Sequence, residues 1–512
     1  MKAIVTSILS IVILVGIQAQ DPGELDLTFG INGISRLPLN FSNNIETISV
    51  LPDDHIITGG QYFEEDYGSV CVSAKLDENG TMINYGSTGT VEHNFNPGVE
   101  SECIYASQIL PNGKIILAGH QSTPANVFVM QLLSDGTFDA SFSGDGIFTD
   151  DSFSFKVNNI EIFGDETNYT IAVCGTDNGY DIPQIIMLNQ EGYVVSGFGT
   201  GGLYQMTEHD GEFLDIVIDP ANSCFYGCGY EWLSPDAFVS KHQLSTGTLI
   251  EEFGTNGIYT FSGLSSHIRT ETMLMNEAAN LITAFGYLLH PDGDNDIFGI
   301  RLNASDGTLD ETFGIGGFSS LRIPGQDEFI EDAVSQGDEK YYVGGHTFSV
   351  GDGADFMVGR ILNNGYADPS FGSGGFTVVD IDNHDQVKSI ALSNDESKLY
   401  AGGMSGYGNP YYTGTIACFH TGYTVGIAEK KSEPGLICRV YPNPANEIIT
   451  IETGNEDTYT IEVYDLAGKL LKSETLFGEN LHLNVSGIHE GMYLLNVISG
   501  NKFIKSSKII IQ

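Results

Sequence analysis

Three carboxylates alternate along one short stretch of the chain, at Asp292, Asp294 and Asp296. Alternating oxygen ligands of this kind are what a calcium-binding loop uses. The stretch is not an EF-hand, because Ile297 stands where that loop needs glycine and Asn303 stands where it needs a bidentate glutamate. We therefore expect a looser calcium site at the three aspartates. The sequence leaves open that they form only a solvated acidic turn.

Other residues that could do chemistry give weaker signals. Asp352 and Asp355 repeat part of the acidic pattern further along the chain. Four histidines could act as bases: His120 and His346, which each follow a glycine, and His209 and His384, which each precede an aspartate. The sequence contains no Gly-x-Ser-x-Gly elbow and no His-Glu-x-x-His, and its carboxylates are too numerous for a glycosidase pair to be chosen. We therefore expect no catalytic residue and no cofactor other than calcium.

The elements that position these residues come from a repeated phrase of the form Phe-Gly-x-x-Gly. Its seven copies begin at Phe29, Tyr85, Phe142, Phe198, Phe253, Phe313 and Phe371. The near-constant spacing indicates one supersecondary unit that is used seven times, each copy burying its apolar face against the next. In the fifth unit the phrase is followed by short apolar pieces rich in β-branched and aromatic residues, which is typical of strands.

Four antiparallel strands in each of seven units predict a seven-bladed β-propeller over residues 20–422. The last unit stops at Gly422, and the chain begins near Asp21 with the part of the unit that this last copy lacks. The two ends are therefore complementary, as a closed ring requires. We expect the glycines of the phrase to make tight turns, and its aromatic residue to be a wedge between adjacent units.

The phrase extends to Asp-Gly-Thr-Leu-Asp-x-x-Phe-Gly-x-x-Gly at residues 306–317. A downstream piece of the unit reads Asn-Gly-Lys-Ile-Ile-Leu-Ala-Gly at residues 112–119. They resemble the delta-60 repeat of exported bacterial proteins, and the resemblance covers nearly all of residues 21–422. Tyr85 and Ser143 depart from the pattern. The resemblance implies a propeller-like fold and no assigned chemistry.

The end of the chain differs in character. Residues 423–437 form a charged linker that contains proline and glycine. Residues 438–512 offer six short strands, 448–452, 459–464, 470–473, 481–485, 492–497 and 508–511. They predict a small immunoglobulin-like β-sandwich, with a hairpin turn at 465–469.

Several motifs of this tail occur in a characteristic order: Tyr-Pro-Asn-Pro at 441–444, Val-Tyr-Asp-Leu-Ala-Gly at 463–468 and Gly-Met-Tyr-Leu-Leu at 491–495. They resemble the C-terminal sorting domain of the type IX secretion system of Bacteroidetes. The resemblance implies that residues 438–512 bind the secretion machinery. It implies delivery of the chain to the surface of a Gram-negative bacterium or to the medium. An ordinary immunoglobulin-like binding module is the alternative.

The start of the chain and its charge agree with export. Residues 1–19 consist of Met1, Lys2 and an apolar run too short to span a membrane, which is typical of a signal peptide, and no other stretch has spanning length. Asp and Glu outnumber Lys and Arg by 67 to 21. Such a chain repels phosphate backbones, so we expect no nucleic-acid partner. The seven cysteines lack a Cys-x-x-Cys pair, and we expect Cys174 and Cys228 to be buried rather than bridged.

These observations together favour an exported, non-enzymatic propeller that binds a glycan or protein ligand or serves as a structural scaffold. Two other functions remain open. One is an extracellular glycan-active enzyme, a hydrolase or lyase, because propellers often gather catalytic groups around their axis. The other is a cell-surface component of adhesion or gliding, with protein partners.

Overall fold

The computed structural model consists of strands and turns, divided between a unit that ends at Tyr423 and a C-terminal unit from Thr424 to Gln512. It describes residues 21–511 except for these positions: 40–41, 65–67, 87–88, 94–100, 122–125, 166, 178, 180–181, 235, 262–264, 266, 291–292, 338–339, 350–352, 407–411, 424–438, 442–443, 447, 465–469, 490 and 500–501. The predicted signal peptide, the predicted linker apart from Tyr423, and the predicted hairpin turn at 465–469 lie outside the described residues. No helix in the described part of the chain is long and apolar enough to cross a membrane.

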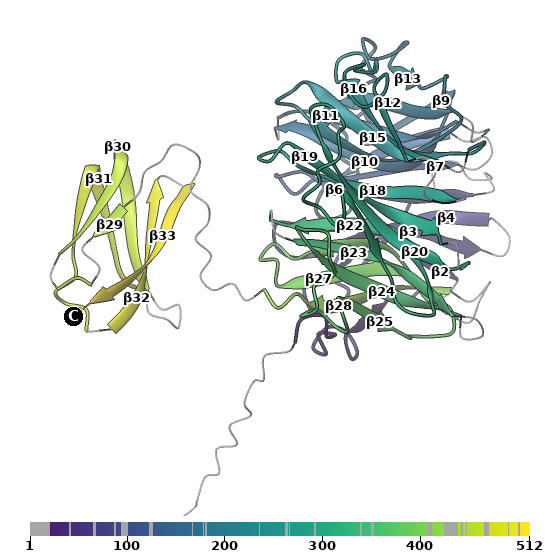
Figure 1. Ribbon diagram of the computed structural model, residues 1–512. Helices are drawn as coiled ribbons and strands as arrows, with labels where there is room; N and C mark the ends of the chain where they lie inside the picture. Colours follow the sequence, from purple (N-terminus) through teal and green to yellow (C-terminus); the bar gives the residue numbers. More distant parts are fainter. Residues whose placement is uncertain are drawn as a thin grey trace, which may run out of the picture. The chain divides into compact units, whose positions relative to one another are not determined.

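The first unit consists of seven four-stranded antiparallel sheets, which confirms the predicted seven blades (Figure 1). Blades 1 to 3 are β2 (Asn43–Val50), β3 (Ile56–Glu64), β4 (Gly68–Leu76) and β5 (Thr90–His93); β6 (Glu102–Ile109), β7 (Ile115–Gln121), β8 (Asn126–Leu132) and β9 (Ile147–Ser154); and β10 (Lys156–Asp165), β11 (Asn168–Thr176), β12 (Pro183–Asn189) and β13 (Leu203–Gln205). Blades 4 and 5 are β14 (Gly211–Asp219), β15 (Cys224–Glu231), β16 (Ala237–Gln243) and β17 (Ile258–Phe261); and β18 (Ile268–Asn276), β19 (Leu281–Leu289), β20 (Asn295–Asn303) and β21 (Phe318–Leu321). Blades 6 and 7 are β22 (Asp327–Gln336), β23 (Lys340–Ser349), β24 (Gly353–Leu362) and β25 (Phe376–Val379); and β26 (Gln386–Leu392), β27 (Lys398–Gly406), β28 (Tyr412–His420) and β1 (Ile34–Arg36).

The ring is closed by the two ends of this unit. The first strand of each blade contacts the first strand of the next, and β26 of blade 7 contacts β2 of blade 1. We call these seven strands the inner strands. β1 pairs antiparallel with β28, with Ile34 opposite Ala417, so the N-terminal segment supplies the outer strand of the last blade. The complementary ends predicted from the sequence therefore meet.

The repeated phrase joins each blade to the next by one backbone hydrogen bond. The residue after the aromatic donates its backbone N–H to a backbone carbonyl of the following blade. This carbonyl lies in the turn that precedes the next copy of the phrase. The seven bonds are Gly30 to Asn79, Gly86 to Asp135, Ser143 to Glu191, Gly199 to Thr246, Gly254 to Asp306, Gly314 to Asn364 and Gly372 to Pro22, with N to O distances from 2.6 to 3.2 Å. All seven aromatic residues of the phrase are buried, as a wedge between blades requires.

The last glycine of the phrase is needed for its conformation. Gly257 has φ of 90°, and a β-carbon on it would lie 2.8 Å from the Cβ of Leu249. The preceding Asn256 also has a positive φ, 56°, which asparagine tolerates better than other side chains do. The tight turn predicted for this phrase is therefore present.

The described cysteines are free and buried. They are Cys71, Cys103, Cys174, Cys224, Cys228 and Cys418, and Cys438 lies outside the described residues. Cys174 and Cys228 are thus buried thiols, as predicted, and burial raises the pKa of both.

The C-terminal unit is an all-β module around its own apolar core, which includes Ile449, Ile461 and Leu495. Its strands are β29 (Arg439–Tyr441), β30 (Ile448–Tyr464), β31 (Leu470–Asn484), β32 (Gly491–Ser499) and β33 (Lys502–Ile511). The sheet order is β29-β30-β32-β33, with β31 on β30, and a parallel bridge between Ala445 and Ile511 curls it back on itself. The first two predicted strands are continuous as β30 and the next two as β31, because the pairing resumes after a register shift between Glu452 and Asp457.

We predict that Gly257→Val destabilises the protein by about 2 kcal/mol or more, because the new side chain would combine a strained positive φ with a clash against Leu249. Thermal unfolding measures the change. The matched control is Gly316→Asn, since Gly316 (φ 64°) occupies the place that Asn256 holds in the previous blade and has open space around it. If both variants unfold at the wild-type temperature, the turn does not constrain the fold.

Candidate functional site

Each inner strand carries one β-bulge. In all seven blades the pairing between the inner strand and the second strand skips one residue, which is left out of the ladder. We call the skipped residues the bulge ring: Glu46, Tyr105, Asn158, Leu214, Glu271, Glu331 and Lys388. A bulge turns its side chain away from the normal alternation, and here it does so at the same level in every blade.

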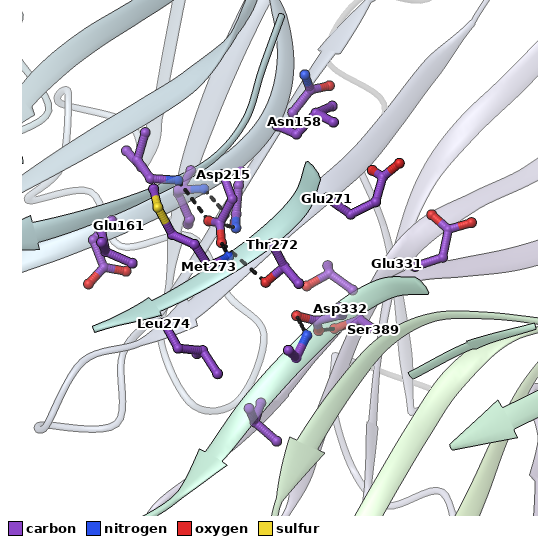
Figure 2. Close-up of a pocket in the computed structure, with 18 of the residues that line it drawn as sticks. Asn158, Glu161, Asp215, Glu271, Thr272, Met273, Leu274, Glu331, Asp332 and Ser389 are labelled. Carbon is purple, nitrogen blue, oxygen red and sulfur yellow. Dashed lines mark hydrogen bonds between the residues drawn. The ribbon is translucent and has the colours of Figure 1, made fainter. Parts of the chain in front are cut away.

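The bulge ring lines a cavity of about 550 Å³ that is formed by all seven inner strands. Residues from every blade contribute to its wall, so it lies where the inner strands converge on the ring axis. Figure 2 shows part of this axial pocket, with Glu271 and Glu331 extending from neighbouring inner strands. Its size falls within the range of small-molecule sites.

The residue that follows the bulge binds the neighbouring blade. In blade 4, Asp215 accepts hydrogen bonds from Asn159 Nδ2 of blade 3 (2.7 Å) and from the backbone N of Met273 in blade 5 (2.8 Å). In blade 6, Asp332 accepts one from the backbone N of Ile390 in blade 7 (2.9 Å). These bonds, marked in Figure 2, hold adjacent inner strands in register around the pocket.

The charges of the pocket are mostly negative. Its wall contains the carboxyl groups of Glu46, Glu161, Asp215, Glu271, Glu277, Glu331 and Asp332, and Lys388 is the one lysine or arginine among the lining residues. The Lys388 Nζ lies 2.8 Å from Glu331 Oε1. Just outside the wall, Arg269 Nε lies 2.5 Å from Glu271 Oε1. An acidic pocket with its cation already paired favours a positively charged ligand.

Burial and mutual repulsion raise the pKa values of some of these acids, and Lys388 lowers that of Glu331. Burial raises the pKa of Glu46 to about 7, and the neighbouring Glu331 adds to the rise. Burial also raises the pKa of Glu271 to about 7 and that of Asp332 to about 7. Burial acts on Glu331 as well, but the Lys388 ammonium outweighs it and lowers its pKa. At neutral pH the pocket therefore holds an ionised Glu331 beside acids that are partly protonated.

Two of the four candidate histidines lie against the bulge ring. His120 stacks on Tyr105, with ring centroids 4.6 Å apart, and its Nδ1 accepts the backbone N–H of Val157. His346 Nδ1 is 3.8 Å from Glu331 Oε1. Burial lowers the pKa of His120 to about 3 and that of His346 to about 4, so both are neutral.

The other two histidines stand apart from the pocket. The Nδ1 of His209 lies 2.8 Å from Glu231 Oε1, so its carboxylate partner is Glu231 rather than the adjacent Asp210. His384 lies in the loop before β26, with its ring 6.0 Å from that of Tyr412. The structure therefore does not bring the four histidines together.

The calcium site expected at Asp292, Asp294 and Asp296 stays a prediction. Asp292 lies outside the described residues. Arg322 reaches both of the others, with Nη2 2.6 Å from Asp294 Oδ2 and Nε 3.6 Å from Asp296 Oδ1. The guanidinium of Arg322, which directly follows β21, thus supplies positive charge at this acidic stretch.

The bulge ring was missed in the sequence, although a faint signal for it exists. Each member follows the aromatic residue of the preceding phrase at a similar interval, such as Glu46 after Phe29 and Glu331 after Phe313. The residue types at these positions differ from blade to blade, so no motif marks them.

Two family models match parts of the chain. Residues 439–512 match the secretion system C-terminal sorting domain. The C-terminal module is a sorting domain. Residues 110–142, which include β7 and β8, match a domain of unknown function that is described as a beta-propeller, DUF5122. Both resemblances seen in the sequence are thus confirmed, and the protein is an exported propeller that its sorting domain directs to the cell surface or the medium.

Solved structures with a similar course of the chain are distant. The hydrazine synthase of Kuenenia stuttgartiensis is 10% identical, over 71% of this chain and 94% of that one, with a TM-score of 0.41. The beta-propeller domain of the Trilobed protease from Pyrococcus furiosus is 8% identical, over 71% and 91%, with a TM-score of 0.35. The polysaccharide lyase Uly1 is 10% identical, over 77% and 93%, with a TM-score of 0.37. No function follows from similarities this low. No curated protein is significantly similar to the sequence.

The raised pKa of Glu46 predicts that this residue lowers the free energy of unfolding as the pH rises. The folded state holds the proton to about pH 7, whereas the unfolded chain releases it near 4.5, so the stability contributed by this group falls as the pH rises between these values. Glu46→Gln should therefore raise the free energy of unfolding by roughly 1–3 kcal/mol at about pH 8 and leave it unchanged at about pH 4. Denaturant unfolding at the two pH values measures both.

Glu331→Gln is the matched control, and its effect on the free energy of unfolding should have the opposite sign. Its pKa is lowered by Lys388, so its loss should destabilise the protein at about pH 8. Equal effects of the two variants would contradict the charge arrangement described for the pocket.

The sorting domain predicts a clear export phenotype. A chain that ends at Tyr423 should fold as a propeller but remain inside the cell envelope, because the segment that binds the secretion machinery is missing. Immunoblots of cell fractions and medium measure this, with the Gly316→Asn full-length chain as the exported control. Export of the shortened chain at the normal level would show that another segment carries the signal.

Proposed function

We propose that the protein is a non-enzymatic, exported binding scaffold whose axial pocket holds a ligand with protonated amino groups beside hydroxyl groups, such as an amino sugar in an extracellular glycan. The observation that carries this proposal is the excess of carboxyl groups around the pocket, in which Lys388 is already paired with Glu331.

The raised pKa values support a cationic ligand. Glu46, Glu271 and Asp332 retain protons at neutral pH because burial and their neighbours disfavour further negative charge. An ammonium group in the pocket would stabilise their ionised forms, so binding would be coupled to the release of protons. A ligand with negative charge would meet the opposite effect.

The uncharged lining residues suit the hydroxyl groups of a sugar. Ser107, Asn158 and Thr272 are among the residues of the wall, and each can donate or accept hydrogen bonds. Tyr105 adds an aromatic face that is backed by His120. The cavity of about 550 Å³ has room for a short saccharide.

A glycan-active enzyme is the second candidate, and one observation favours it. Glu331 is held ionised by Lys388, while the pKa of Glu271 in the adjacent blade is raised to about 7. A pair of carboxyl groups with pKa values pushed apart is what acid-base cleavage of a glycosidic bond uses. In that case Glu271 would donate the proton and Glu331 would act as base or nucleophile.

Calorimetric titration with two matched ligands tests the proposal. Oligomers of glucosamine carry free amines, and oligomers of N-acetylglucosamine have the same backbone with the amines blocked. We expect the first to bind with at least tenfold higher affinity at about pH 7, with a measured heat that depends on the ionisation enthalpy of the buffer, because binding releases protons that the buffer takes up. Equal affinity for both, or binding of neither, would overturn the amino-sugar proposal. Release of shorter sugars during the titration would favour the enzyme.

The double variant Glu46→Gln, Glu271→Gln shows whether the ligand is in the pocket. It should weaken binding at least tenfold, although it changes a net charge of −46 by only two units. The control replaces two exposed acids elsewhere, Glu251→Gln and Glu252→Gln, and should bind as the wild type does. Equal weakening in both would mean that the polycation is attracted only by the overall charge.

A further inference from the structure

We propose that Asp355, Asp380 and Asp385 form a divalent-cation site of the calcium type at the seam between blades 6 and 7. This site is separate from the axial pocket and from the acidic stretch at residues 292–296, and it does not depend on the proposed function.

The three aspartates converge from three places in the fold. Asp355 lies on β24, Asp380 directly follows β25, and Asp385 directly precedes β26 of the next blade. One carboxylate oxygen of each lies within 4.8 Å of the others. Two ligands that are each about 2.4 Å from one calcium ion can be at most about 4.8 Å apart, and every pair among the three oxygens meets this limit.

Asp385 brings to the cluster a buried carboxylate oxygen without a hydrogen-bond partner among the described residues. Its side chain is fully buried (0% exposed). Its Oδ2 accepts the backbone N–H groups of Ile381 and Asp382, but its Oδ1 has no hydrogen-bond partner in the described part of the chain. A buried carboxylate oxygen without a partner is costly unless a cation or a proton satisfies it. Burial and the neighbouring Asp382 and Asp355 raise the pKa of Asp385 to about 6.

The preceding seam, between blades 5 and 6, shows what the same three places do when a cation is built in. Asp296 corresponds to Asp355. Asp296 lies four residues before Ile300, which pairs with the first residue of β21, and Asp355 lies four residues before Gly359, which pairs with the first residue of β25. Arg322 corresponds to Asp380, four residues after the start of that strand.

The third place, three residues before the bulge, is held by a buried acid in both seams. Glu328 corresponds there to Asp385. The equivalence extends to the backbone, because Ile323 N donates to Glu328 Oε1 (3.1 Å) as Ile381 N donates to Asp385 Oδ2 (2.7 Å).

The two seams differ at the place that Arg322 holds in the first and Asp380 holds in the second, and this difference in charge defines the site. In the first seam the Arg322 guanidinium brings positive charge to Asp296 and Asp294. In the second seam the same place holds an exposed carboxylate, Asp380, which adds negative charge. The nearby Arg36 forms an ion pair with Asp382 (2.9 Å). A bound divalent cation would supply the charge that Arg322 supplies one blade earlier.

The donor set indicates which cations fit. All three ligands are carboxylate oxygens, which calcium and magnesium prefer and which zinc and copper sites rarely use alone. Asp380 is exposed, so water can complete the coordination shell. A site of three carboxylates with several waters belongs to the weak, extracellular class of calcium sites, with a Kd of about 10⁻⁴–10⁻³ M.

Calcium chloride titrated into the full-length protein, after treatment with a chelator, tests the proposal by calorimetry and by thermal unfolding. We expect saturable binding and a rise in Tm of roughly 1–4 °C at millimolar calcium. Asp380→Arg, which copies the Arg322 arrangement, should abolish both effects of calcium. It should still fold, because Asp380 is exposed and the equivalent arginine is tolerated one blade earlier.

Asp294→Asn separates this site from the acidic stretch at 292–296 and should leave the calcium response unchanged. Two results would overturn the proposal. One is a wild-type protein that neither binds calcium nor changes its Tm. The other is an Asp380→Arg variant that responds to calcium as the wild type does. If Asp294→Asn alone loses the response, the ion binds at residues 292–296 instead.

Discussion

The structure depends on one hydrogen bond that occurs at every seam between blades. The amide after the aromatic residue of the phrase donates to the carbonyl of a turn in the next blade, and the buried aromatic packs beside it. Six of these bonds use turns that lie between the third and the outer strand of one blade. The seventh, from Gly372 to Pro22, joins blade 6 to the N-terminal segment, whose strand β1 pairs with β28 and completes blade 7. Since both ends of the repeat region take part, the ring closes only when all seven units are present.

Closure of the ring creates the axial pocket and also its electrostatic strain. The seven inner strands each carry a bulge at the same level, so closing the ring brings seven bulged side chains to one axis. Three of the seven are glutamates and one is lysine. The Glu331–Lys388 pair offsets part of the repulsion, and protons held by Glu46 and Glu271 offset more. Stability is lost there at neutral pH, which is typical of sites that are kept for binding.

Much of the fold follows from the sequence because its signals are local and repeated. The Phe-Gly-x-x-Gly phrase predicts the turns, the seven blades and the complementary ends, and all are observed. The separate strands predicted in the tail are joined in β30, because a register shift near Asp457 lets the ladder continue where the sequence indicates a break. The secretion tail was recognisable because its motifs occur in order within residues 439–512.

The sites were harder to predict, because they depend on register and on contacts between blades. Nothing in the sequence near Glu46 or Glu331 shows that a bulge turns them to the axis, since a bulge is a property of the pairing with the next strand. The alternating aspartates near Asp294 suggested calcium, but Arg322, which reaches them, lies beyond the next strand. Asp355, Asp380 and Asp385 come from separate segments, so only the fold brings them together.

Hydrogen exchange of the seven seam amides tests ring closure most directly. These are the N–H groups of Gly30, Gly86, Ser143, Gly199, Gly254, Gly314 and Gly372. A closed ring predicts that the Gly372 amide exchanges as slowly as the other six, since all open only with the global unfolding of the ring. If Gly372 exchanges much faster than the rest, the seam to Pro22 is open in solution, and the axial pocket is not enclosed by seven fixed blades.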